Sequence, residues 1–141
     1  MTVQLIPYLT LNGEARNAIA FYEQAMGAKV LSAQTFGEGP ASPEKPMDEV
    51  VKGWIAHAVL KIGETVIFIA DAEPGQIQAE GTRLTLCITT DDAQTTRVFY
   101  ENLQEGGTIL HPLEQTYFSP AYGMVTDKFG VTFQVFTNRP N

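Results

Sequence analysis

Two stretches of this chain are nearly alike: FYEQAMGAKVL over residues 21–31 and FYENLQEGGTIL over residues 99–110. Each begins on the apolar face of a predicted helix, passes a glycine and enters a predicted strand. Three identical residues in a row carry little weight alone, but the order of elements around them also repeats. Internal duplication constrains the topology of a whole chain, so it is considered before any other feature.

The first half is predicted to contain a strand, a helix and three more strands. Apolar residues recur at helical spacing over 15–26, with Asn12 as the expected cap, Glu14 in the first turn and Gly27 at the end. The expected strands are 3–11, 28–36, 55–62 and 65–71, the last two joined by a hairpin at Gly63-Glu64. Residues 37–53, with three prolines and several charges, are predicted to be a long loop without a helix: a lid, a dimer contact or a disordered segment.

The second half repeats this order after a predicted linker at residues 72–81. Asp91 is expected to cap a helix with Gln94 three residues on, and Phe99 and Tyr100 are expected in the core. The predicted strands are 82–90, 108–113, 122–126 and 131–137.

The two halves predict one α+β domain over residues 1–141, built of two β-α-β-β-β modules at about 1–71 and 82–138. A single helix covers only one face of a four-stranded sheet, so each module leaves its other face open. We therefore expect two curved mixed sheets around a cleft, lined by the side chains that alternate away from the helices.

Composition restricts the partners of such a domain. The 141 residues carry 9 basic and 16 acidic side chains, a net charge of −7, without a basic cluster, which argues against nucleic acid. The single cysteine excludes an intrachain disulfide and favours a reducing compartment. The start of the chain lacks a signal-peptide pattern and no apolar run is long enough for a membrane helix, so the expected location is the cytoplasm.

Four segments resemble the PhnB-like branch of the vicinal oxygen chelate superfamily, which includes glyoxalases, bleomycin resistance proteins and dioxygenases. They are residues 18–22 before Gly27, 55–58, 68–71 and, above all, 125–131, which reads VTDKFGV. The resemblance covers nearly the whole chain. It implies paired β-α-β-β-β modules and a homodimer whose cleft is shared between subunits. It does not select a reaction, because the superfamily contains isomerases, dioxygenases, antibiotic-modifying enzymes and pure binding proteins.

The resemblance also implies where a metal would bind. In metal-bearing relatives the ligands occupy positions that correspond here to Pro7, Phe68, Thr85 and Gln134. Proline and phenylalanine cannot ligate, and a threonine hydroxyl is a weak ligand. Only Gln134, where the metal enzymes carry Glu, keeps a suitable donor. We therefore expect no tightly bound catalytic metal and no other cofactor, with a divalent metal as the alternative.

His57 is the candidate catalytic residue, since its ring can act as a base or a ligand near neutral pH. The alternative is a histidine hydrogen-bonded in the cleft wall or the dimer seam. His111 is expected at the surface, and Asp71 is expected to form a turn at the end of its strand. Cys87 has no basic neighbour to activate it and is expected to be inert and packed.

An aromatic pocket for a flat or apolar ligand is predicted from Trp54, Phe68, Tyr117, Phe118 and Tyr122, with packing in the core as the alternative. The predicted ligand-binding residues are Trp54, Phe68, Cys87, Tyr122 and Gln134.

Two functions remain open. The first is a metal-independent small-molecule-binding protein. The second is a metal-dependent lyase, isomerase, dioxygenase or resistance enzyme in which His57, with Gln134 or Asp71, holds a metal or moves a proton.

Overall fold

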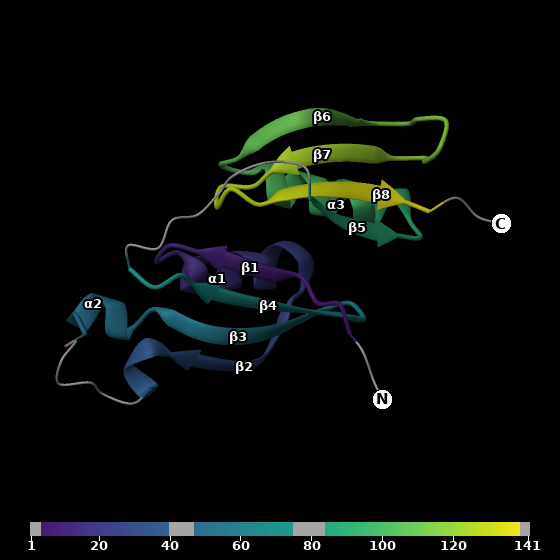
Figure 1. Ribbon diagram of the computed structural model, residues 1–141. Coiled ribbons are helices and arrows are strands. Elements are labelled where there is room, and N and C mark those ends of the chain that lie inside the picture. The colour runs from purple at the N-terminus through teal and green to yellow at the C-terminus, as the bar shows by residue number, and fades with distance from the viewer. Residues whose placement is uncertain (1–3, 40–46, 75–83, 139–141) are drawn as a thin grey trace. The chain divides into compact units, whose positions relative to one another are not determined.

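The computed structural model describes residues 4–39, 47–74 and 84–138, which form two compact units divided between residues 78 and 79 (Figure 1). The first unit contains β1 (Tyr8–Leu11), α1 (Ala15–Met26), β2 (Lys29–Thr35), the 3₁₀ helix η1 (Phe36–Glu38), α2 (Glu49–Lys52), β3 (Ile55–Ile62) and β4 (Thr65–Asp71). The second contains β5 (Leu86–Thr90), α3 (Ala93–Gln104), β6 (Thr108–Glu114), β7 (Tyr122–Thr126) and β8 (Thr132–Thr137). Among the described residues, no helix is long and apolar enough to cross a membrane.

Each unit forms one four-stranded mixed sheet, with strand orders β1-β4-β3-β2 and β5-β8-β7-β6. The first and last strands of each unit pair in parallel, and the other neighbours are antiparallel. The two units therefore share one topology, and the predicted fold class of paired β-α-β-β-β modules is confirmed.

The repeated sequence that suggested the duplication ends in the same backbone irregularity in both units. Pairing of β2 with β3 skips Leu31, and pairing of β6 with β7 skips Leu110. An extra residue of this kind is a β-bulge, which bends a strand and turns the following side chains. The likeness between the two stretches thus extends to the register of the edge strands.

Helix α1 packs its apolar stripe on one face of the first sheet, but its start is not built as predicted. Its N-cap position is Glu14, and no side chain there bonds to the helix. The carboxylate of Asp71, at the end of β4, replaces the expected cap. Its Oδ1 accepts hydrogen bonds from the backbone amides of Gly13 at 2.8 Å and Ala15 at 3.0 Å. Asn12 was therefore the wrong cap, because a residue distant in sequence provides the acceptor.

Helix α3 covers one face of the second sheet in the same way, as Figure 1 shows. Its cap is Asp92 rather than Asp91, and the Asp92 carboxylate accepts from the Thr95 amide at 3.1 Å. Tyr100 is buried as predicted, whereas Phe99 is only half-buried.

The long segment predicted as a helix-free loop contains two short helices among its described residues, η1 and α2. Asp48 caps α2 by accepting a hydrogen bond from the Val50 amide at 2.9 Å, a local signal that the proline content obscured. The prolines at 40, 43 and 46 lie outside the described residues, as do most of the predicted linker and the start of the strand predicted at 82–90.

Candidate functional site

In the second unit, the sheet face opposite α3 carries the polar and aromatic side chains. A Cβ on Gly123 would lie 2.9 Å from the Tyr100 ring of α3, so the neighbours of Gly123 in β7 point to the opposite face. We call this the open face. The strand register arranges its side chains in two rows: Cys87, Gln134, Met124 and His111; then Thr89, Phe136, Tyr122 and Glu114.

A line of hydrogen bonds crosses this face. The Tyr122 hydroxyl is 2.7 Å from Gln134 Oε1, and Gln134 Nε2 donates to Thr85 Oγ1 at 2.9 Å. We call these three residues the polar line. Both ends of the Gln134 amide are bonded, so its plane is fixed against the sheet.

Aromatic rings gather around the Tyr122 end of the polar line. The ring centroids of Phe118 and Tyr122 are 5.2 Å apart, and Phe118 lies nearly parallel to Phe136 with centroids at 5.8 Å. The His111 ring is 5.1 Å from Tyr122. These four residues form the aromatic cluster. Tyr117 packs edge-on against Phe118 but is 91% exposed, so it is not a core residue.

Phe118 belongs to the connection between β6 and β7, and the neighbouring Ser119 ties that connection to the sheet. Ser119 is fully buried, and its Oγ lies 2.8 Å from the Thr137 carbonyl oxygen and 3.2 Å from the Thr137 amide nitrogen. The loop is thus anchored next to the ring that it presents. Because the buried Ser119 hydroxyl is hydrogen-bonded to the Thr137 backbone, it holds the loop in place and gives the Phe118 ring a defined position.

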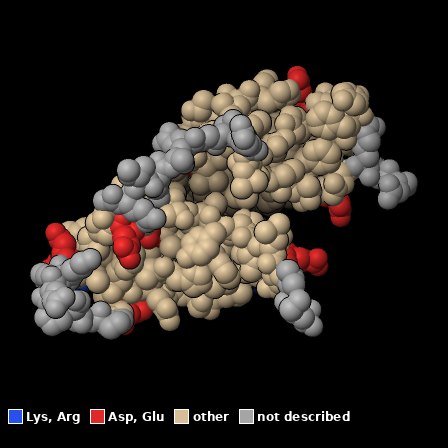
Figure 2. All heavy atoms as spheres, viewed as in Figure 1, with Lys and Arg blue, Asp and Glu red and all other residues tan. Residues whose placement is uncertain are grey.

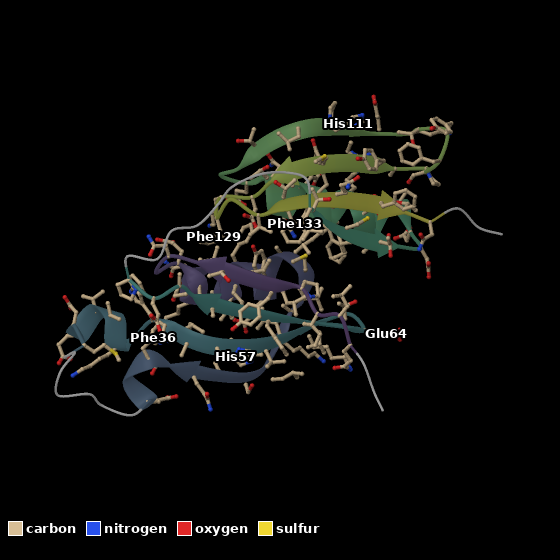
Figure 3. The ribbon with its side chains drawn as sticks, in the orientation of Figure 1. Phe36, His57, Glu64, His111, Phe129 and Phe133 are labelled. Carbon is tan, nitrogen blue, oxygen red and sulfur yellow. The ribbon has the colours of Figure 1, made fainter. Side chains whose placement is uncertain are left out.

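His111 is part of the cluster rather than a plain surface residue. Its Nδ1 lies 2.9 Å from the Pro112 carbonyl oxygen and its Nε2 lies 3.5 Å from Glu114 Oε1. Because a carbonyl oxygen only accepts, the hydrogen belongs on Nδ1 in the neutral ring. Figure 3 shows His111 on β6 of the second unit and His57 on β3 of the first.

Cys87 lies directly across from Gln134 in the register of β5 and β8. Its side chain is exposed, so the expectation that it is packed was wrong. Neighbouring atoms nevertheless exclude water from part of this side chain, and this desolvation raises the pKa of the Cys87 thiol.

This raised pKa predicts slow alkylation of Cys87 near neutral pH, because the thiolate is the reacting form. We expect iodoacetamide to react with the folded protein more slowly than with glutathione at pH 7.5, and the rate to climb as pH rises above the ordinary thiol range. Mass spectrometry of timed aliquots measures the rate, with the urea-unfolded protein as control. Faster reaction in the folded state than in urea would contradict the prediction.

In the first unit, a second group of rings lies on the sheet face away from α1. The Tyr8 hydroxyl is 3.1 Å from His57 Nδ1, and the ring centroids of His57 and Phe68 are 4.8 Å apart. Tyr8 stands directly opposite Phe68 in the register of β1 and β4, and the Pro7 carbonyl oxygen accepts a hydrogen bond from the Phe68 amide at 2.9 Å. Sequence reasoning missed Tyr8. The alternation of Tyr8 and Thr10 with the aliphatic Leu9 and Leu11 is the sequence signal that could have found it.

Two other candidate site residues, Asp71 and Trp54, have structural roles in the first unit. Asp71 is buried against α1, and its Oδ2 accepts from the Ile55 amide at 2.9 Å, so the structure does not bring it together with His57. The Trp54 ring packs against the turn before α1, where a Cβ on Gly13 would lie 2.8 Å from Trp54 Cζ2. The backbone φ of +86° at Gly13 independently requires glycine at this turn.

The donor set does not fit a divalent metal. The oxygen of Gln134 is engaged by Tyr122, and Phe68 offers only a ring. Within the parts of the chain that the structure describes, no three His, Cys, Asp or Glu side chains gather as metal ligands would. The chemistry on these faces is hydrogen bonding and ring contact.

The model of the Glyoxalase/Bleomycin resistance protein/Dioxygenase superfamily matches residues 6–135. Protein YjdN of Escherichia coli (strain K12) is 31% identical over 137 residues, covering 93% of this chain and 92% of YjdN. The crystal structure of protein PA1353 from Pseudomonas aeruginosa is 29% identical, with a TM-score of 0.86 over 99% of this chain and 100% of that one.

A PhnB protein from Bacillus cereus, described as a putative 3-demethylubiquinone-9 3-methyltransferase, has the same fold. It is 22% identical, with a TM-score of 0.79 over 96% of this chain and 99% of that one. The predicted resemblance to this superfamily, with a PhnB protein among the structural neighbours, is confirmed.

Proposed function

This chain belongs to the Glyoxalase/Bleomycin resistance protein/Dioxygenase superfamily, and we propose that within it the protein binds a small molecule without a tightly bound catalytic metal. The observation that supports this most is the state of Gln134. At the one candidate metal position that keeps a suitable donor, the amide is bonded to Tyr122 and to Thr85. An amide fixed in this way is suited to recognising a ligand by hydrogen bonds.

The aromatic cluster supplies the second half of such a site. Small-molecule sites combine apolar and aromatic walls with a few fixed polar groups. Here Phe118, which is 39% exposed, and Phe136 supply aromatic rings, and the polar line begins at Tyr122, which belongs to both groups. In the view of Figure 2, most of the surface of each unit is uncharged and its Asp and Glu side chains are scattered. We propose that the ligand lays a flat ring on the cluster and directs a polar group to Gln134.

The chain's single cysteine allows this proposal to be tested without a known ligand. Cys87 stands across from Gln134, so a fragment captured there as a disulfide samples the proposed site. At equilibrium in a mild reductant, a fragment library screened by mass spectrometry reports local affinity, and the slow reaction of the thiol does not matter. We expect flat aromatic fragments to be enriched at Cys87, and Phe118→Ala to abolish that enrichment.

The matched control moves the thiol to a different surface. In the double variant Cys87→Ser with Gln94→Cys, the cysteine lies exposed in the first turn of α3. We expect no preference for flat rings there. Equal capture of the same fragments at both positions would show that the open face has no affinity of its own, and would overturn the proposal.

The metal-dependent alternative is tested by titration with Mn²⁺ alone. Paramagnetic relaxation of solvent water reports bound Mn²⁺, and the wild-type protein is compared with His57→Ala and Gln134→Ala. We expect no stoichiometric binding in any of them, because the donors are engaged or unsuitable. One Mn²⁺ per chain that is lost in His57→Ala would replace our proposal by the metal-dependent enzyme.

A further inference from the structure

The polar line has a definite hydrogen-bonding capacity that restricts what it can bind. Tyr122 and Thr85 each carry one hydroxyl hydrogen, and the Gln134 amide carries two hydrogens. The two bonds within the line use two of these four hydrogens. Among the described residues, the structure records no acceptor for the other two.

This result does not depend on how the Gln134 amide is oriented. With Oε1 toward Tyr122, the free hydrogens are the second amide hydrogen and the Thr85 hydroxyl hydrogen. With the amide turned over, Thr85 donates to Oε1 and the Tyr122 hydroxyl hydrogen is freed instead. In either case two donors remain, one on the amide and one on a hydroxyl. The open face therefore offers hydrogens to a ligand.

The charges on this face decide between a neutral acceptor and an anion. Glu114 stands opposite Tyr122 in the register of β6 and β7. Glu114 Oε1 lies 3.5 Å from His111 Nε2, and His111 carries charge only when it is protonated. A carboxylate or phosphate on the ligand would be repelled by the nearby Glu114 carboxylate, and the net charge of −7 on the chain acts in the same direction, whereas a neutral carbonyl group carries no net charge to be repelled.

From the proposed function we infer the class of ligand: an uncharged planar ring compound with a carbonyl oxygen conjugated to the ring. The ring lies against Phe118 and Phe136, and the carbonyl oxygen accepts the free hydrogens of the polar line. A ring without an acceptor leaves those donors unpaired when it displaces their water, which lowers its affinity.

The test compares three fluorinated probes of similar size by ¹⁹F NMR relaxation: 4-fluoroacetophenone, 1-ethyl-4-fluorobenzene and 4-fluorobenzoate. We expect the ketone to bind about 10-fold more tightly than the ethyl compound, the ratio that one to two hydrogen bonds typically supply. We expect the carboxylate to bind more weakly than the ketone.

Gln134→Glu is the most specific variant, because it keeps the shape of the side chain and replaces its N–H donors by an acceptor. We expect it to remove the preference for the ketone over the ethyl compound. Thr85→Val is expected to reduce that preference. Gln94→Glu on α3 introduces the same charge on a different surface and serves as the control, with thermal unfolding to verify that each variant is folded.

The outcomes separate this inference from the function on which it rests. If the two uncharged probes bind equally in the wild-type protein, the proposed site stands and the inference about donors is wrong. If 4-fluorobenzoate binds most tightly, the requirement for a neutral ligand is wrong. If no probe binds and disulfide capture also fails, the proposed function itself is overturned.

Discussion

Asp71→Asn is expected to lower the free energy of unfolding by about 3 kcal/mol. The Asp71 carboxylate is 4% exposed and accepts three backbone hydrogen bonds: from Gly13 and Ala15 at one oxygen, and from Ile55 at the other. An asparagine retains one of these oxygens and places an NH₂ group at the other. That group is a donor, so one backbone N–H must face a donor or lose its partner. Urea unfolding followed by circular dichroism measures the loss.

The matched control is Asp92→Asn, which makes the same change at the start of the other long helix. Asp92 is exposed, and bonds from Thr95 satisfy it on the helix surface. We expect a clearly smaller loss than at Asp71, because water can replace the missing bonds. Equal losses in the two variants would show that the buried carboxylate is no more than an ordinary helix cap.

Gly107→Ala is expected to destabilise the second unit by about 3 kcal/mol, at the upper end of the cost of overpacking. Gly107 immediately precedes β6. A Cβ there would overlap the carbonyl oxygen of Thr126 and lie 3.0 Å from the backbone of Asp127. Because these obstacles are backbone atoms, rotation of a side chain cannot relieve them, and the start of β6 must move away from β7. We expect that movement also to shift His111, which lies on the same strand.

Hydrogen exchange measured by NMR locates this effect. We expect the amides of β6 and β7 to lose protection in Gly107→Ala while those of the first unit keep it. Gly53→Ala is the control, since a Cβ added there would lie 3.6 Å from its nearest neighbour, the Val50 carbonyl oxygen, and the backbone φ of Gly53 is −85°. We expect Gly53→Ala to leave stability unchanged or slightly higher. Normal protection of β6 in Gly107→Ala would contradict the steric argument.

The sequence was most informative where local patterns set the structure. The periodicity of apolar residues and the positions of glycines predicted both long helices and the eight strands found among the described residues, because each element depends on neighbouring residues and on the spacing of apolar side chains. The repeated stretches then related the two halves, and the match extends to the bulges at Leu31 and Leu110. Errors arose at element ends, where the competing caps Asp91 and Asp92 are adjacent.

The candidate site was only partly predictable, for a physical reason. Residue types suggested His57, Gln134 and the aromatic residues, but the partners of these side chains are set by pairing between distant strands. Tyr8 is hydrogen-bonded to His57, 49 residues away in sequence, and Thr85 is hydrogen-bonded to Gln134, also 49 residues away. A shift of one residue in the pairing would turn either partner to the opposite face of its sheet.

The sequence by itself determined the two modules, their elements and the family to which the chain belongs, since these depend on local propensity and on duplication. Tertiary structure alone decided that a carboxylate from β4 starts α1, that Trp54 packs on a turn, and that Gln134 is bonded at both ends. Those outcomes depend on register and on which face each side chain occupies. Both properties arise only when the strands pair.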